Sequence, residues 1–177
     1  MIILPDDPVA REIIREAQSR IPILEDPIGS NRSPELDALC DKWGIPRGSY
    51  WCALLAADVW HEAGVEVPPI DGDSHPARCE SWRLWALKTG RFSVTPGLGY
   101  AVLYGEHGKA PAEHMGVCVA SIRPLLYDFE GNTADARSER FTRNGELATL
   151  KPVNVDRVIG YVSPLPLAAS QIAKVAA

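Results

Sequence analysis

Residues 48–64, GSYWCALLAADVWHEAG, place a cysteine at the start of an expected helix. A glycine–serine turn precedes a helix over residues 51–63, and Gly64 ends it. Cys52 then lies in the first turn, where unpaired N–H groups and the positive end of the helix dipole stabilise a thiolate. This position lowers the pKa of a thiol, and the same N–H groups can hold an oxyanion. The alternative is that Cys52 only packs behind its neighbours, because free cysteines are commonly buried.

The rest of the chain divides into helices followed by strands. Apolar residues at helical spacing predict three further helices, at residues 8–19, 34–43 and 77–89. Runs rich in Val, Tyr and Ile predict strands at residues 99–104, 113–120, 125–130 and 155–162. Because no helix falls between the strands, we expect an α+β fold with N-terminal helices packed against an antiparallel sheet.

Composition restricts the class of protein. The 177 residues predict a single domain over residues 1–166, with a flexible tail over residues 167–177. The net charge of −5 argues against nucleic-acid binding, whose footprint is normally basic. No apolar run is long enough for a membrane span, and the N-terminus does not resemble a secretory signal. We therefore expect a monomer made in the cytoplasm, without membrane insertion.

The other three cysteines are expected to be core residues. Cys40 and Cys79 lie on apolar helix faces, and Cys118 lies within an apolar strand. The spacing CxxC, typical of zinc and redox sites, is absent from the sequence. His75 and Cys79 could face one another, but two ligands do not make a structural zinc site. No metal and no cofactor are therefore expected.

A cysteine nucleophile needs a base and a group that orients the base. His114 begins the strand HMGVCVA, and the following strand ends in DFEGN. If these two strands form a hairpin, Glu130 returns close to His114. Asp128, Glu130 and Asn132 project from the same side of an extended chain, so each could accept the second ring N–H. The alternatives are a histidine that is only hydrogen-bonded in the core and polar groups that only cap a turn.

Four stretches carry a resemblance to a known family. They are GSNRSPELDALCDKWGIPRGSYWCA (29–53), WCALLAADVWHEAG (51–64), EHMGVCV (113–119) and FEGNT (129–133). In content and order they resemble the cysteine, histidine-dependent amidohydrolase/peptidase (CHAP) family of peptidoglycan hydrolases. This papain-like group is related to the NlpC-type cell-wall peptidases. The similarity covers about residues 29–161 and implies a papain-like fold.

The resemblance implies roles for particular residues. Cys52 would be the nucleophile, and His114 the general base and later the acid. Either Glu130 or Asn132 would orient His114. Asn31, Tyr50 and Trp51 are candidates to line the substrate groove, although packing or turn formation explains them equally well. Some family members bind calcium through acidic residues beside the cysteine; GIPRGSY has none, so calcium is not expected.

The implied activity is cleavage of an amide bond in the peptide stem or cross-link of bacterial peptidoglycan through an acyl-enzyme. The implied setting is a phage lysis enzyme that reaches the cell wall after release through a membrane lesion. Delivery by a secretion machine or presence in a virion would leave the same sequence features. The alternatives are a catalytically silent papain-like module that binds wall peptides or belongs to a virion, and a cysteine acyltransferase or protein-directed protease on the same fold.

Overall fold

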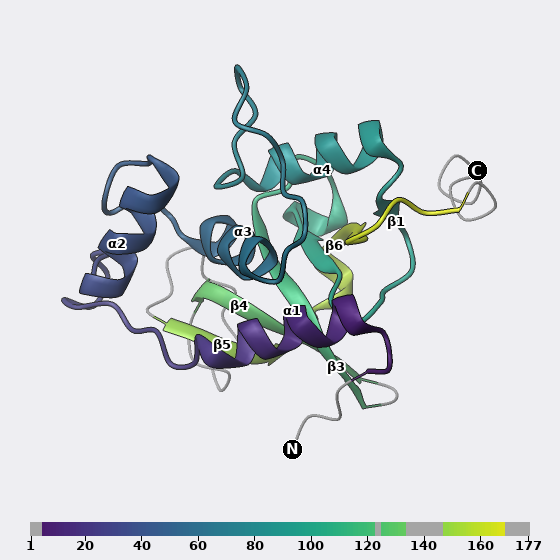
Figure 1. Cartoon of the computed structure of the whole chain (residues 1–177), viewed down its shortest axis with the longest axis horizontal. Helices are drawn as coiled ribbons and strands as arrows, with labels where there is room; N and C mark the ends of the chain where they lie inside the picture. Colours follow the sequence, from purple (N-terminus) through teal and green to yellow (C-terminus); the bar gives the residue numbers. More distant parts are fainter. Residues whose placement is uncertain (1–4, 123–124, 134–146, 169–177) are drawn as a thin grey trace.

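The computed structural model of the chain describes residues 5–122, 125–133 and 147–168 (Figure 1). Within these ranges the four expected helices are confirmed. They are α1 (Pro8–Ser19), α2 (Pro34–Trp43), α3 (Cys52–Glu62) and α4 (Cys79–Thr89).

The first two helices begin where side chains satisfy their free N–H groups. Asp7 accepts hydrogen bonds from two backbone N–H groups in the first turn of α1, both at 2.9 Å. Ser33 accepts one at 3.2 Å at the start of α2. A proline follows each cap at the first helical position, where its missing N–H costs nothing. Gly44 ends α2 in the left-handed conformation that glycine adopts without strain.

The strands of the described residues form one antiparallel sheet in the order β1-β6-β2-β3-β4-β5. They are β1 (Phe92–Ser93), β2 (Ala101–Tyr104), β3 (His114–Ile122), β4 (Leu125–Thr133), β5 (Leu147–Pro152) and β6 (Val158–Val162). The expected α+β class is thereby confirmed.

Three differences from the predicted strands have local causes. β1 has only two residues, too few to show a period. β5 was not predicted, because its sequence LATLKP mixes polar and apolar residues without clear alternation. Residues Val155–Arg157, expected to begin the last strand, instead form a short 3₁₀ turn. Residues 134–146 of the expected polar loop and residues 169–177 of the expected tail lie outside the described residues.

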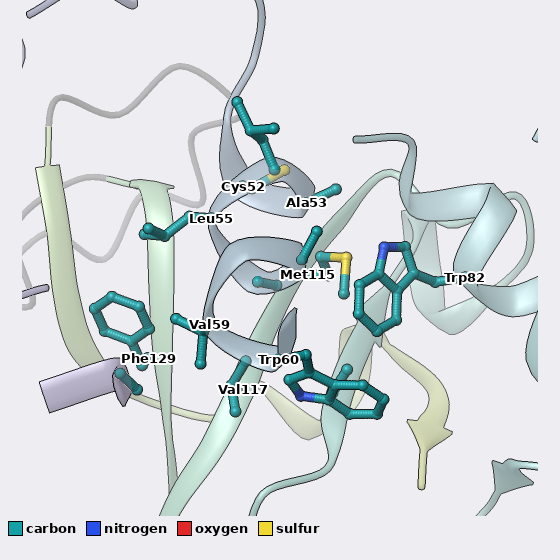
Figure 2. Packing of buried hydrophobic residues seen from close by; sticks show 14 of the residues in the cluster. Cys52, Ala53, Leu55, Val59, Trp60, Trp82, Met115, Val117 and Phe129 are labelled. Atoms are coloured by element: carbon teal, nitrogen blue, oxygen red, sulfur yellow. The ribbon is translucent and has the colours of Figure 1, made fainter. Parts of the chain in front are cut away.

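The core lies between the helices and one face of the sheet. Every residue of α3 from Cys52 to Trp60 is buried, so this helix is covered on all sides. Figure 2 shows Met115 and Val117 of β3 and Phe129 of β4 facing α3. At the far end of the helix Trp60 packs edge-on against Trp82 of α4, with ring centroids 5.0 Å apart. These contacts hold the N-terminus of α3 beside the start of β3.

Alternation along β3 places His114 and Cys118 on the face opposite Met115 and Val117. Met115 and Val117 belong to the core under the helices, whereas Cys118 belongs to a second apolar cluster with Tyr104. His114 therefore projects from the face that bears Tyr104. In the part of the chain described, no helix is long and apolar enough to span a membrane.

Two glycines provide a matched test of how closely α1 approaches the sheet. Gly64 (φ 72°) and Gly99 (φ 78°) are both left-handed, so alanine at either costs about 1–2 kcal/mol. A Cβ at Gly64 would meet nothing within 4 Å, but one at Gly99 would lie 2.9 Å from the Cα of Ala10 in α1. We expect Gly99→Ala to lower the free energy of unfolding by about 1–3 kcal/mol more than Gly64→Ala. Urea denaturation measures both, and equal losses would contradict this packing.

Candidate active site

The candidate nucleophile lies at the junction of a helix and a strand. Cys52 is the first residue of α3 and is 8% exposed. The residue before it, Trp51, supplies no side-chain cap, so the first-turn N–H groups are not taken up by a capping side chain. The imidazole of His114 and the backbone N–H of Met115 lie close enough to the Cys52 thiol to lower its pKa. The structure therefore brings Cys52 and His114, both predicted site residues, close together.

The second ring nitrogen of His114 contacts Glu130. His114 Nε2 lies 3.1 Å from Glu130 Oε2, and both side chains are buried. Pairing of β3 with β4 produces this contact, as expected from the hairpin. Glu130 pairs with Gly116 rather than with His114, so its side chain reaches diagonally across the strand. Glu130 is thus placed to orient the imidazole.

Gly116 leaves the space that the Glu130 side chain needs to reach His114. A Cβ at this position would lie 2.4 Å from Asp128 Oδ2 and 3.0 Å from the Cγ of Glu130. Any side chain here would displace the carboxyl groups of Asp128 and Glu130. The glycine of the HMG sequence is therefore required by the space beneath the imidazole, not by its backbone angles.

Charges in the site favour a thiolate and an imidazolium. The hydrogen bond from the thiol of Cys79 and the charge of His114 together outweigh burial and hold the pKa of Cys52 well below that of a free thiol. Burial alone would lower the pKa of His114, but the Cys52 thiolate and Glu130 raise it to about 10. Burial opposes ionisation of Glu130, yet its hydrogen bond with His114 lowers its pKa. These shifts all favour the charged forms of the three groups, which are a thiolate, an imidazolium and a carboxylate.

A second buried carboxyl group, that of Asp128, lies beside the site. Burial, reinforced by the charge of Glu130, raises the pKa of Asp128 well above its usual value. The Tyr104 hydroxyl donates to Asp128 Oδ2 at 2.7 Å, and the Tyr104 ring stacks on His114 with centroids 5.9 Å apart. Tyr104 thus joins Asp128 to the imidazole through a hydrogen bond and a ring stack, while Glu130 contacts the imidazole directly.

Cys79 is the main residue that sequence reasoning placed elsewhere. We expected a core thiol; it is buried, but its sulfur lies 3.7 Å from that of Cys52. Cys79 is the first residue of α4, so two helix N-termini meet at the pair of thiols. With Cys52 as the thiolate, Cys79 is the donor of the S–H···S hydrogen bond. The sequence signal that could have identified Cys79 as a site residue is its position in the first turn of a helix, the same feature that identified Cys52.

A pocket of about 230 Å³ opens at the two sulfur atoms. Its lining residues are Tyr50, Cys52, Ala77, Cys79, Ala112 and Glu113. Tyr50, one of the predicted groove residues, lines this pocket and is 60% exposed. The volume suits one side chain of a peptide, since pockets for whole drug-sized ligands are commonly larger, about 300–1,000 Å³.

The other two predicted groove residues belong to a structural network. Trp51 is fully buried and donates its indole N–H to Glu25 Oε1 at 3.0 Å, so it does not line the pocket. The backbone N–H of Asn31 donates to the other oxygen of Glu25, also at 3.0 Å. Asn132 donates its amide to Asn31 Oδ1 at 2.9 Å, and no described contact joins it to His114. Of the two candidates left open by the sequence, Glu130 contacts His114.

This network explains the local turns around the nucleophile. Asn31 and Asn132 both adopt a positive φ, 54° and 52°, which asparagine tolerates better than most residues. Glu25, which sequence reasoning missed, is buried and joins the segment before α2 to the residue that precedes Cys52. Among the described residues, no group of three or more His, Cys, Asp or Glu side chains is arranged to hold a metal ion.

The four thiols are predicted to differ in reactivity. Burial raises the pKa of Cys40 and of Cys118, whereas that of Cys52 is lowered. We expect iodoacetamide to modify Cys52 in the folded protein near pH 7, well before Cys40 and Cys118, because the thiolate is the reactive form. Peptide mapping by mass spectrometry gives the order, and uniform slow labelling would contradict the ion pair.

A second prediction separates the two carboxyl groups. Glu130→Gln removes the charge that stabilises the imidazolium, so the pKa of His114 should fall and that of Cys52 should rise. The rate of Cys52 alkylation should then reach its plateau at a higher pH than in the wild type. Asp128→Asn is the matched control, because burial disfavours a charge on Asp128 and its replacement should therefore change the pH profile less. Identical profiles for both variants would exclude Glu130 as the charged partner.

Comparisons of the chain with family models, with curated proteins and with solved structures found no match. What this site does must therefore be inferred from its own residues and geometry.

Proposed function

We propose that this chain is a cysteine hydrolase that cleaves an amide bond of bacterial peptidoglycan through an acyl-enzyme. The observation that carries the proposal is the contact series Cys52–His114–Glu130, with the nucleophile in the first turn of α3. A nucleophile, a base and a group that orients the base are the parts that covalent amide hydrolysis requires. All three are buried together beside a pocket, which is the arrangement expected of an active site.

The chemistry follows from the charges. The Cys52 thiolate attacks the amide carbonyl carbon, and the N–H groups of the first turn of α3 stabilise the resulting oxyanion. His114, already protonated, donates its proton to the departing amine as the C–N bond breaks. His114 then takes a proton from water, which attacks the thioester and releases the acid. Glu130 holds the ring orientation and stabilises its charge throughout.

The substrate and the fold family rest on the sequence resemblance. Four stretches similar to CHAP peptidoglycan hydrolases occur in the family's order. A buried helix that begins with the nucleophile and packs on an antiparallel sheet bearing the base and the acid supports a papain-like arrangement. We therefore propose peptidoglycan peptides as the substrate and a phage lysis enzyme as the biological role. The complete set of reacting groups favours a hydrolase over a catalytically silent binding module.

The proposal is tested by the loss of turbidity of purified sacculi. Wild-type protein should clear them, and Cys52→Ser should reduce the rate by roughly 10³-fold or more, as removal of a nucleophile does in other hydrolases. Cys40→Ala, which removes a buried thiol of α2 outside the site, is the matched control and should retain the activity. Mass spectrometry of the released fragments identifies the bond that is cut.

Two outcomes would overturn the proposal in different ways. Equal clearing by wild type and Cys52→Ser would exclude thiolate chemistry. No clearing by a wild-type protein whose Cys52 still reacts rapidly with iodoacetamide would retain the reactive thiol but exclude peptidoglycan as the substrate.

A further inference from the structure

We propose that Cys79 is a resolving thiol that captures oxidised Cys52 as a reversible Cys52–Cys79 disulfide. The inference goes beyond the proposed function and does not depend on it, because it concerns the two sulfur atoms alone.

The first support is distance and direction. The sulfurs lie 3.7 Å apart, and a disulfide requires about 2.05 Å, so they must approach by about 1.65 Å (3.7 − 2.05). Both residues are the first of their helices, and both line the same pocket. The two side chains therefore project toward one space, and rotation of the side chains can supply much of the approach.

The second support is that one partner is activated and accessible. The reactive form of a cysteine toward peroxides is the thiolate, and oxidation favours low-pKa thiols that solvent can reach. Cys52 is held as a thiolate by His114 and Cys79, and the pocket of about 230 Å³ admits a small peroxide. The remaining thiols differ: Cys118 lies in the second apolar cluster with Tyr104, and Cys40 is a buried residue of α2.

The reaction balances with hydrogen peroxide as the oxidant. The Cys52 thiolate attacks one peroxide oxygen to form a sulfenic acid, and the released hydroxide takes the proton of His114 to become water. The Cys79 sulfur then attacks the sulfur of the sulfenic acid; the S–S bond forms, the S–O bond breaks, and a second water leaves. Two thiols thus lose two electrons to one peroxide. Thiol–disulfide exchange with a dithiol reductant restores both.

The consequence is an inactive but recoverable protein. In the disulfide, Cys52 no longer offers a nucleophile, so any chemistry that uses it stops. Without a neighbouring thiol, a sulfenic acid proceeds under excess peroxide to sulfinic and sulfonic acids, which reductants do not reverse. Cys79 therefore protects the nucleophile from permanent loss.

The experiment treats the folded protein with one equivalent of hydrogen peroxide and then counts thiols in denaturant. The count should fall from four to two in the wild type, and peptide mapping should find the Cys52–Cys79 cross-link. Dithiothreitol should restore four thiols and the alkylation of Cys52. Cys40→Ala should form the same cross-link. In Cys79→Ser and in Cys79→Ala, excess peroxide should instead convert Cys52 to sulfinic and sulfonic acids.

Other results would overturn the proposal. It fails if Cys52 of the wild type becomes sulfinic acid as fast as in the Cys79 variants, or if the cross-link joins a different pair. Because mass and thiol count require no substrate, these outcomes are independent of whether the protein cleaves peptidoglycan. Circular dichroism of the Cys79 variants shows whether they are folded, and use of both serine and alanine keeps the comparison open if one of them is not.

Discussion

The structure around the site depends on keeping a thiolate and an imidazolium stable inside a protein core. Burying charge is costly unless each charge has partners at close range. Cys52 has a hydrogen bond with Cys79, the charge of His114 stabilises its thiolate, and it lies at the N-terminus of α3. His114 has the thiolate on one side and Glu130 on the other. The alternating charges lower the energy of all three groups together.

The same constraint decides which neighbours must be neutral or small. Asp128 lies two residues from Glu130 and projects from the same face, so two carboxylates here would repel strongly. The raised pKa of Asp128 reflects that repulsion together with burial, and its hydrogen bond with Tyr104 positions the ring on which His114 stacks. Gly116 meets the steric side of the same requirement, since a Cβ would collide with both carboxyl side chains. The raised pKa of Asp128 and the missing side chain of Gly116 thus both help to keep Glu130 beside His114.

Local signals account for what could be predicted from the sequence. Asp7 and Ser33 cap helices whose apolar spacing is clear, and the β3–β4 hairpin follows from two apolar runs, which is why Glu130 could be placed near His114. The contact of Cys52 with Cys79 spans 27 residues and depends on how α4 packs. The apolar periodicity of α3 gives no information about which other helix end packs against its N-terminus. The contact of Trp51 with Glu25 could not be predicted for a similar reason, because Glu25 lies in a segment without a regular period.

The position of Cys79 affects both the reactivity of the Cys52 thiolate and what happens to Cys52 when it is oxidised. A hydrogen bond to the Cys52 thiolate increases the fraction of nucleophile at neutral pH, but it also reduces the intrinsic nucleophilicity of the sulfur, since nucleophilicity falls with pKa. A nonpolar neighbour would leave a stronger but scarcer nucleophile, whereas a hydroxyl donor would stabilise the thiolate without being able to form a bond to it. A thiol is the side chain of this size that can both donate to a thiolate and form a covalent bond with its oxidised form. Burial in the apolar core favours cysteine over serine at the start of α4, and the proposed capture of oxidised Cys52 would add a second role that hydrogen bonding alone does not require.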